Sequence, residues 1–200
     1  MTARLPQDLR SDARDNRDRI LGAARAMFGT DGLDVPIREI ARRAEVGPAT
    51  VYRHFPAKET LAAETFTRQA LAWQSTMDEG LADPDPWHGF RVAVGKLCEL
   101  QARDHGFIAA FKSTFPRAVD FAAIRASSLT SAAGLLRRVK ETGRLRPDVG
   151  TGDLILMIMA NDGIHASTPA ARIAASRRFA ALMIRAFQAS PGTDEPDLLR

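Results

Sequence analysis

The fold of the N-terminal region is decided by the stretch Ile37-Arg-Glu-Ile-Ala-Arg-Arg-Ala-Glu-Val-Gly-Pro-Ala-Thr-Val-Tyr-Arg-His-Phe55. Its apolar residues recur at a helical spacing on both sides of a break at residues 45–47, and Pro48 suits the first turn of a second helix. Two short helices joined by a tight turn form a helix-turn-helix, whose second helix can enter the major groove of DNA. The residues predicted to hold the pair together are Ile37, Ile40, Ala44, Val46 and Val51.

The residue types left facing outward on the second helix suit DNA. Thr50, Tyr52 and His54 can hydrogen-bond phosphate oxygens, and Arg53 can reach phosphate or guanine. Pro and Ala side chains can pack on thymine methyl groups, and Lys58, with the N-terminus of the helix that starts near it, offers another phosphate anchor. The pattern alone is equally compatible with a simple helical hairpin in another all-α protein.

Composition supports a globular protein and gives only weak support for an anionic partner. The chain has 200 residues, is 45% hydrophobic and carries a formal net charge of +4. Residues 1–60 hold eleven Lys and Arg against nine Asp and Glu, and the remainder seventeen against fifteen, so a basic patch has to arise from folding.

The single cysteine, Cys98, excludes an intrachain disulfide and a multi-cysteine zinc site, and we expect it to be a small core residue. No metal site or cofactor is predicted. The N-terminus has no apolar signal region, and the longest apolar run, Leu154–Ala160, is too short to span a bilayer. These features predict a soluble, cytoplasmic protein without a membrane partner.

Helical periodicity continues along the chain without strand alternation, which predicts an all-α fold of about nine helices. Charged residues 1–14 are predicted to form a flexible arm, and a first helix is expected from Asp15 or Asn16. Pro, Gly and Asp residues mark the predicted breaks between the remaining helices. Further helices are expected at roughly 58–81, 86–104, 107–115, 117–142, 151–166 and 170–188.

The segment from Arg19 to Leu61 resembles the N-terminal domain of the TetR repressors. The matching residues are Ile20-Leu21-x-Ala-Ala24, Phe28-x-x-x-Gly32, Ile40-Ala41-x-x-Ala44, Val46 and Thr50-Val-Tyr-Arg-His-Phe55, followed by Lys58. The resemblance implies a three-helix DNA-binding domain at 15–60, an effector-binding and dimerisation domain at 61–190, and a flexible tail at 191–200.

The resemblance also implies roles for single residues. Backbone contacts fall to Thr50, Tyr52, His54, Lys58 and Arg38, and the variable, base-reading positions are Gly47, Pro48, Ala49 and Arg53. Three positions depart from the pattern of the family. Glu45 stands where the turn commonly has Gly, so a left-handed backbone is expected there, Gly47 replaces a Ser or Thr cap, and Pro36 replaces a frequent Thr.

Candidate residues of the C-terminal region come from apolar and aromatic side chains at helical spacing. A pocket for a small lipophilic effector is predicted from Trp73, Met77, Phe111, Phe115, Phe121, Asn161, Asp162 and His165. The three polar members could instead satisfy one another or face a partner. A homodimer interface is predicted from Leu154, Ile158, Phe179, Met183 and Phe187, the alternative being helices buried within the monomer.

The sequence thus predicts a ligand-responsive transcriptional regulator, a repressor that binds a palindromic double-stranded operator as a homodimer and is released by a small effector. The alternative is a small-molecule binding protein that retains a vestigial DNA-binding head. The chain carries no phosphate loop, dinucleotide fingerprint, nucleophile elbow or zincin motif, so we expect that it is not an enzyme.

Overall fold

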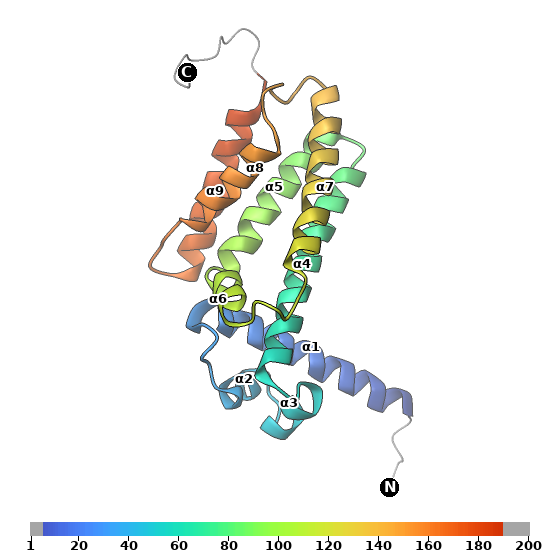
Figure 1. The fold of residues 1–200 in the computed structure, drawn as a ribbon, viewed down its shortest axis with the longest axis vertical. Coiled ribbons are helices and arrows are strands. Elements are labelled where there is room, and N and C mark those ends of the chain that lie inside the picture. Colours follow the sequence, from blue (N-terminus) through green and yellow to red (C-terminus); the bar gives the residue numbers. More distant parts are fainter. Residues whose placement is uncertain (1–5, 190–200) are drawn as a thin grey trace. The chain divides into compact units, whose positions relative to one another are not determined.

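A computed structural model describes residues 6–189, with side chains from residue 12 onward. This range forms nine α-helices and one isolated antiparallel β-bridge, between Leu145 and Gln188, which confirms the predicted all-α class (Figure 1). There are two compact units, residues 6–72 with 103–122 and residues 73–102 with 123–189, each with its own core. The helices are α1 (Pro6–Asp31), α2 (Ile37–Arg43), α3 (Pro48–His54), α4 (Lys58–Ala82), α5 (Pro86–Arg103), α6 (Phe107–Thr114), α7 (Phe121–Glu141), α8 (Thr151–Asp162) and α9 (Pro169–Phe187).

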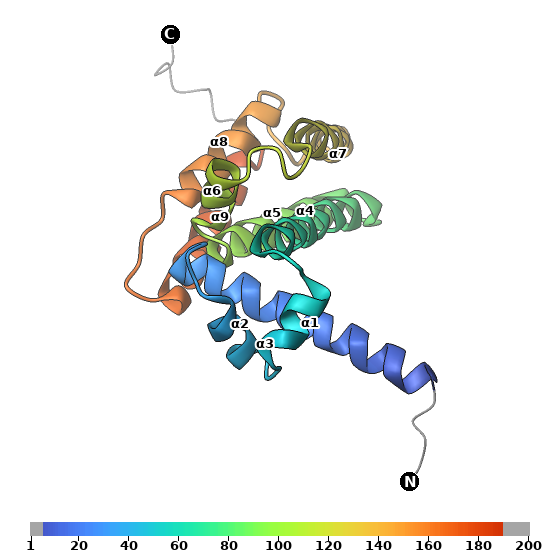
Figure 2. The ribbon, with the colours of Figure 1, turned by 60° about the horizontal axis from the view of Figure 1, so that its bottom comes forward.

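In the first unit, α2 and α3 pack on one another and against α1 (Figure 2). Each has only seven residues, and an isolated helix of that length is unstable in water. Pro36 starts α2 with an extended backbone, and Pro48 occupies the first turn of α3, where its missing N–H costs nothing. What keeps both helices folded is burial of the core side chains Ile20, Phe28, Ile40, Val51 and Phe55, each at most 1% exposed.

The turn between α2 and α3 confirms the backbone expected at Glu45, whose φ is 55°. The Val46 N–H donates to the carbonyl of Ala41 at 3.0 Å, which closes the end of α2. The Glu45 side chain is 85% exposed and lies 4.0 Å from the guanidinium of Arg19, a contact of little energetic weight at such exposure. Glu45 therefore keeps a left-handed conformation that costs about 1 kcal/mol in a residue other than glycine.

Helix α1 starts at Pro6, nine residues before the expected start at Asp15, so residues 6–14 of the predicted arm are helical. Proline is tolerated in a first helical turn, and the sequence has neither Gly nor Pro between Pro6 and Gly22 to end the helix. Alternating charges are as compatible with a solvated helix as with an arm. Residues 1–5 lie outside the described range.

Phenylalanine rings from α1, α4, α6 and the start of α7 fill the remainder of the first unit. The centroid of the Phe66 ring lies 4.8 Å from that of Phe111 and 5.2 Å from that of Phe121. Beside them, Arg25 donates from Nε and one terminal nitrogen to the Asp104 carboxylate, both at 2.8 Å, and the Asp104 side chain is only 2% exposed. A buried carboxylate is costly without a partner, so this pair fixes the chain before α6 against α1.

In the second unit, α4 and α5 cross at a pair of glycines. A Cβ built on Gly89 would overlap the carbonyl oxygen of Gly80, and a Cβ on Gly80 would lie 2.9 Å from the Cβ of Ala93. This close approach lets α4 and α5 share a core with α7, α8 and α9 around Phe90, which is fully buried.

A buried polar network links α5, α8 and α9 in this unit. The Asn161 amide donates to the carbonyl of Cys98 at 3.1 Å and to Gln101 Oε1 at 2.8 Å. The Ser176 hydroxyl lies 2.6 Å from Asn161 Oδ1 and 2.8 Å from the same Cys98 carbonyl. Because these groups satisfy one another, the network specifies how the three helices dock without leaving a buried polar group unpaired.

Several predicted boundaries differ from the structure. The expected division after residue 60 falls inside α4. Helix α7 starts at Phe121 rather than at 117, after turns that follow Pro116, and α8 ends at Asp162 rather than at 166, next to Gly163. The predicted tail at 191–200 lies outside the described residues.

The glycine crossing predicts opposite effects for two substitutions on α5. Gly89→Ala should lower the free energy of unfolding by about 1–3 kcal/mol, because the added methyl overlaps backbone of α4. Gly95→Ala, where a Cβ meets nothing within 4 Å, should raise it by about 0.5–1 kcal/mol through helix propensity. Urea unfolding measures both values. Equal effects of the two substitutions would contradict the crossing.

The turn residue yields a second prediction. Glu45→Gly should stabilise the protein by about 1 kcal/mol, because glycine adopts positive φ without steric cost. Glu45→Ala removes the same charge but keeps the strain, so it should bring no gain. A thermal melt in which both variants shift alike would assign the effect to charge instead.

Candidate nucleic-acid interface and apolar cavity

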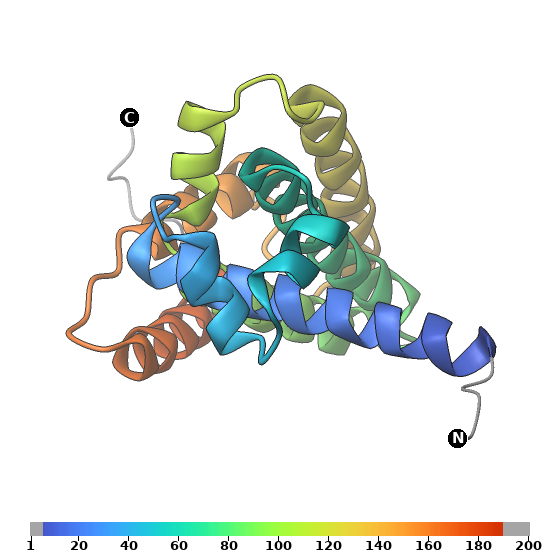
Figure 3. The same ribbon diagram turned by 90° about the horizontal axis from the view of Figure 1, so that it is seen from below.

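Helix α3 is anchored by its apolar side and exposes the opposite one. Val51 and Phe55 are buried, whereas Gly47, Pro48, Ala49, Tyr52 and Arg53 are exposed, with Tyr52 at 52%. Figure 3 shows α2 and α3 toward the viewer, on the near side of α1. Of the nine residues predicted to contact DNA, Arg38 is also exposed, and those half-buried are Thr50, His54 and Lys58.

Helix α2 adds arginines whose charge is partly balanced nearby. Arg38 is 78% exposed and Arg42 76% exposed on their side chains. The Glu39 carboxylate accepts from Arg42 Nε at 3.0 Å and lies 3.8 Å from Arg38 Nε. Exposed pairs of this kind are weak, so both guanidinium groups stay available to a stronger anion such as a phosphate.

The surroundings of His54 limit how its side chain could make the predicted contact to the DNA backbone. Burial, with the nearby positive charges of Arg53 and Arg17, holds the pKa of His54 below its usual value, so the imidazole is neutral near pH 7. Its Nε2 atom is buried and has no hydrogen-bond partner. A contact from this ring to a phosphate would therefore have to use Nδ1.

Arg17 of α1 holds the end of α3, a role that the sequence did not indicate. Its Nε donates to Glu64 Oε1 of α4 at 3.1 Å, and one terminal nitrogen donates to the His54 carbonyl at 3.4 Å. The guanidinium carbon lies 4.6 Å from the centroid of the Phe55 ring. These partners lie 37 to 47 residues away in the sequence, so local spacing could not have revealed them.

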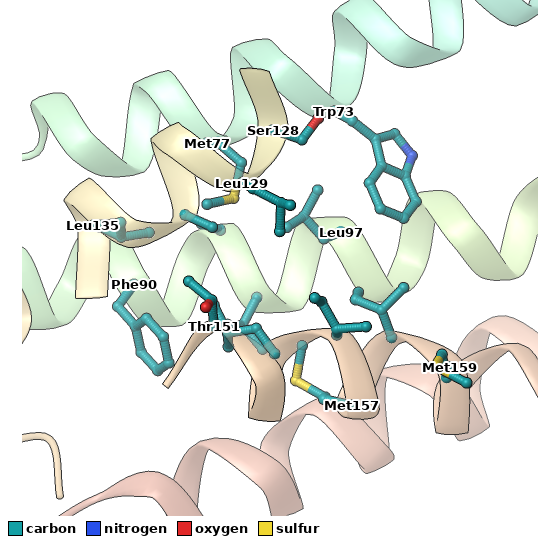
Figure 4. A pocket seen from close by; sticks show the side chains of 16 residues that line it. Trp73, Met77, Phe90, Leu97, Ser128, Leu129, Leu135, Thr151, Met157 and Met159 are labelled. Carbon is teal, nitrogen blue, oxygen red and sulfur yellow. The ribbon is translucent and has the colours of Figure 1, made fainter. Parts of the chain in front are cut away.

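The second unit contains an apolar cavity of about 200 Å³ between α4, α5, α7 and α8 (Figure 4). Trp73 and Met77, both predicted pocket residues, line it. None of the 16 lining residues is charged, and the only hydroxyl groups belong to Ser128 and Thr151. The Ser128 hydroxyl already donates to the Ile124 carbonyl at 3.0 Å. The cavity therefore offers almost pure hydrocarbon contact.

The other predicted pocket residues do not line this cavity. Phe111, Phe115 and Phe121 belong to the phenylalanine cluster of the first unit, since aromatic residues at helical spacing fit a core as well as a pocket. Asn161 is held in the polar network, whereas Asp162, the last residue of α8, and His165, which lies beyond that helix, are exposed.

Four of the five predicted interface residues are half-buried in the single chain, and one is buried. Leu154, Ile158, Phe179 and Met183 pack partly buried against the core, Leu154 and Ile158 also line the cavity, and Phe187 is 7% exposed within the core. The large apolar side chains that α8 and α9 do expose are Leu156 at 64%, Met159 at 66% and Leu182 at 45%.

Cys98 is fully buried, and burial raises the pKa of its thiol to about 12, which makes a thiolate-based role unfavourable. Among the residues that the structure describes, no group of three or more His, Cys, Asp or Glu side chains could hold a metal ion. None of the helices in the described range is both long and apolar enough to cross a membrane.

Comparison with known proteins adds a family to this geometry. The sequence model described as "Bacterial regulatory proteins, tetR family" matches residues 20–65. The HTH-type transcriptional repressor KstR of Mycolicibacterium smegmatis is 34% identical over 100 residues, which cover 48% of this chain and 49% of that protein. KstR of Mycobacterium tuberculosis is 33% identical over 100 residues, 48% of this chain and 46% of that protein. The chain thus spans about half the length of the curated relatives it matches.

Solved structures extend the similarity over most of the chain. The TetR transcription regulatory protein from Mycobacterium vanbaalenii matches with a TM-score of 0.68 and 26% identity, over 90% of this chain and 99% of that one. The ketosteroid transcriptional regulator KstR2 of Mycobacterium tuberculosis shares the fold, with a TM-score of 0.61 and 18% identity over 87% and 95% of the two chains. With its helix-turn-helix at residues 37–55 and its all-helical second unit, the chain belongs to the TetR family of bacterial regulatory proteins.

Proposed function

We propose that this chain is a transcriptional repressor that binds operator DNA as a homodimer and is released by a small apolar effector. The observation that carries the proposal is α3, which buries Val51 and Phe55 and exposes Tyr52, Arg53 and its first turn. A helix anchored on one side and exposed on the other is what insertion into a major groove requires. The relatives named as repressors support the direction of regulation.

Within the DNA complex, the exposed residues would divide into two groups. Thr50, Tyr52 and Lys58 would hold the sugar-phosphate backbone, together with Arg38 on α2. Arg53 would supply base discrimination by a bidentate contact to guanine, since the first turn of α3, Gly47–Ala49, offers only backbone and methyl contacts. Palindromic half-sites about 34–36 Å apart would follow from a two-fold dimer.

The dimer would form through α8 and α9. Leu156, Met159 and Leu182 are exposed there, and a second copy of the chain would remove their apolar surface from water. These three residues lie on the same helices as Leu154, Ile158, Phe179, Met183 and Phe187, from which the interface was predicted, and would extend that interface outward.

The effector would be uncharged, because the cavity has no charged side chain to compensate the desolvation of an ion. The name of one structural neighbour contains the word ketosteroid, and a ketosteroid is an example of an uncharged, largely apolar molecule. The volume of about 200 Å³ is below the roughly 300–1,000 Å³ of typical ligand sites. A larger effector would therefore have to push the walls apart, and such a displacement is the conformational change that release requires.

Gel-shift titrations against DNA upstream of the gene that encodes the chain test the DNA-binding part. The wild-type protein should form a specific complex that weakens as salt rises. Arg53→Ala should cost about 1–3 kcal/mol on specific DNA, and Lys58→Ala should weaken specific and non-specific binding alike and lower the salt slope by about one. Arg91→Ala, an exposed charge on α5, is the control. A wild-type protein without any salt-sensitive specific complex would falsify the proposal.

A pair of dyes with one skeleton tests the nature of the cavity. Neutral N-phenyl-1-naphthylamine should bind and alter the fluorescence of Trp73, while its 8-sulfonate derivative should bind roughly tenfold more weakly because the sulfonate loses its hydration. Ala132→Phe, which places a ring in the cavity, should abolish binding of the neutral dye. Ala133→Phe is exposed on the same helix and should leave that binding unchanged. Equal affinity for the two dyes would contradict an uncharged effector.

A further inference from the structure

A surface groove lies next to the apolar cavity and shares one wall residue with it. The groove has a volume of about 540 Å³ and is bounded by the last turns of α7 and the start of α8. Thr151, the first residue of α8, lines both the groove and the cavity. Ala132 and Leu135 of α7 line the cavity, and their sequence neighbours line the groove, Ala133 and Leu136. The two spaces therefore adjoin across α7 and Thr151.

Thr151 closes one end of the cavity and is a part of the wall that can move at little cost. Figure 4 shows it toward Phe90, away from Met159. Eight residues of α8 separate Thr151 from Met159, which is roughly 12 Å along the helix axis. Thr151 is half-buried and lies between Gly150 and Gly152, which have no side chains to pack around it. The ends of helices also fray more readily than their centres.

The groove differs from the cavity in the hydrogen-bonding groups that it offers. Arg137, which is exposed, and Lys140, which is half-buried, both line it. Lys140 Nζ donates to the Pro147 carbonyl at 2.8 Å, which uses one of its three donors. Glu141 supplies a carboxylate on the same stretch of α7. Because guanidinium and ammonium groups only donate, Arg137 and Lys140 suit a carbonyl or hydroxyl oxygen that enters the groove.

The size of the cavity gives a ligand a reason to continue into the groove. The cavity alone, at about 200 Å³, is smaller than the roughly 300–1,000 Å³ of typical ligand sites. Joined past Thr151, the cavity and the groove together fall within that range. A molecule that uses both has to be apolar along the cavity, where an unpaired polar group would be costly, and polar only at the end that reaches the groove.

We propose that the effector is an elongated, uncharged molecule whose apolar body fills the cavity and whose terminal carbonyl or hydroxyl oxygen passes Thr151 into the groove. There the oxygen accepts hydrogen bonds from Arg137 and Lys140. The inference rests on the proposed effector binding and adds to it the polar end of the ligand. It also identifies the start of α8 as the part of the wall that such a ligand displaces.

Displacement of N-phenyl-1-naphthylamine from the full chain, measured by fluorescence of the dye, tests the inference with two neutral ketones. The chain of tridecan-2-one is longer than the wall of roughly 12 Å between Thr151 and Met159, and that of heptan-2-one is shorter. Arg137→Gln should weaken binding of tridecan-2-one about three- to tenfold, the range for one hydrogen bond, and leave heptan-2-one unchanged. Ala133→Phe, which places a ring in the groove, should weaken tridecan-2-one by about tenfold or more.

Two control variants match these changes at sites outside both spaces. Arg91→Gln removes the same charge from an exposed position on α5, and Ala126→Phe adds the same ring at an exposed position on α7. Neither should change the affinity for either ketone. Unchanged binding of the dye to Ala133→Phe shows that this variant keeps its fold and its cavity.

The outcomes separate this inference from the function on which it rests. If both ketones displace the dye but Arg137→Gln and Ala133→Phe leave tridecan-2-one unaffected, the ligand does not reach the groove. The inference is then overturned while binding in the cavity stands. Equal losses for each variant and its control would also overturn it, because bulk charge or a general loss of packing would then explain them. A wild-type protein that binds neither the dye nor the ketones would remove the proposed effector binding itself.

Discussion

Helix α3 has only seven residues and would not be stable as an isolated helix in water. The positions of its exposed side chains therefore depend on the contacts that anchor it to the rest of the unit. Val51 and Phe55 supply that anchor by burial, and Arg17 adds a directional one by bonding the last carbonyl of the helix and lying over the Phe55 ring. The hydrophobic contacts fix the position of α3, and the guanidinium fixes its end. Tyr52 and Arg53, which lie between the anchors, are exposed and are the side chains proposed to contact DNA.

The second unit contains a buried network of hydrogen-bonded groups and, apart from it, an apolar cavity. The Cys98 carbonyl, Gln101, Asn161 and Ser176 form one buried network in which each finds a partner, whereas Trp73 Nε1 and Arg172 Nε are buried without one. The lining of the cavity is almost entirely apolar. A satisfied network can define helix positions, whereas a hydrocarbon-lined cavity can deform without breaking hydrogen bonds. This combination suits the proposed effector binding, in which the unit would keep its fold while its interior adapts to a ligand.

Prediction from sequence succeeded where the determining interactions are local. The spacing of Ile40, Ala44 and Val51 and the flanking prolines placed α2 and α3, and the left-handed Glu45 followed from its place at a turn position where the TetR pattern commonly has Gly. It failed where partners are distant. Phe111 and Phe121 have the same spacing as cavity residues but fill a different core, because periodicity identifies the buried side of a helix and not what that side meets. The start of α1 was missed because alternating charges fit an exposed helix and an exposed coil equally.

The burial of Cys98 has a practical consequence for experiments in solution. The only thiol of the chain lies inside the second unit and resists ionisation, so maleimide reagents at neutral pH will react far faster with a cysteine introduced at an exposed position. Spin labels or fluorophores can therefore be attached at chosen surface sites without first replacing the native cysteine. The distance between two such labels, one on each copy of the proposed dimer, would then report on that dimer while DNA or a candidate ligand is added.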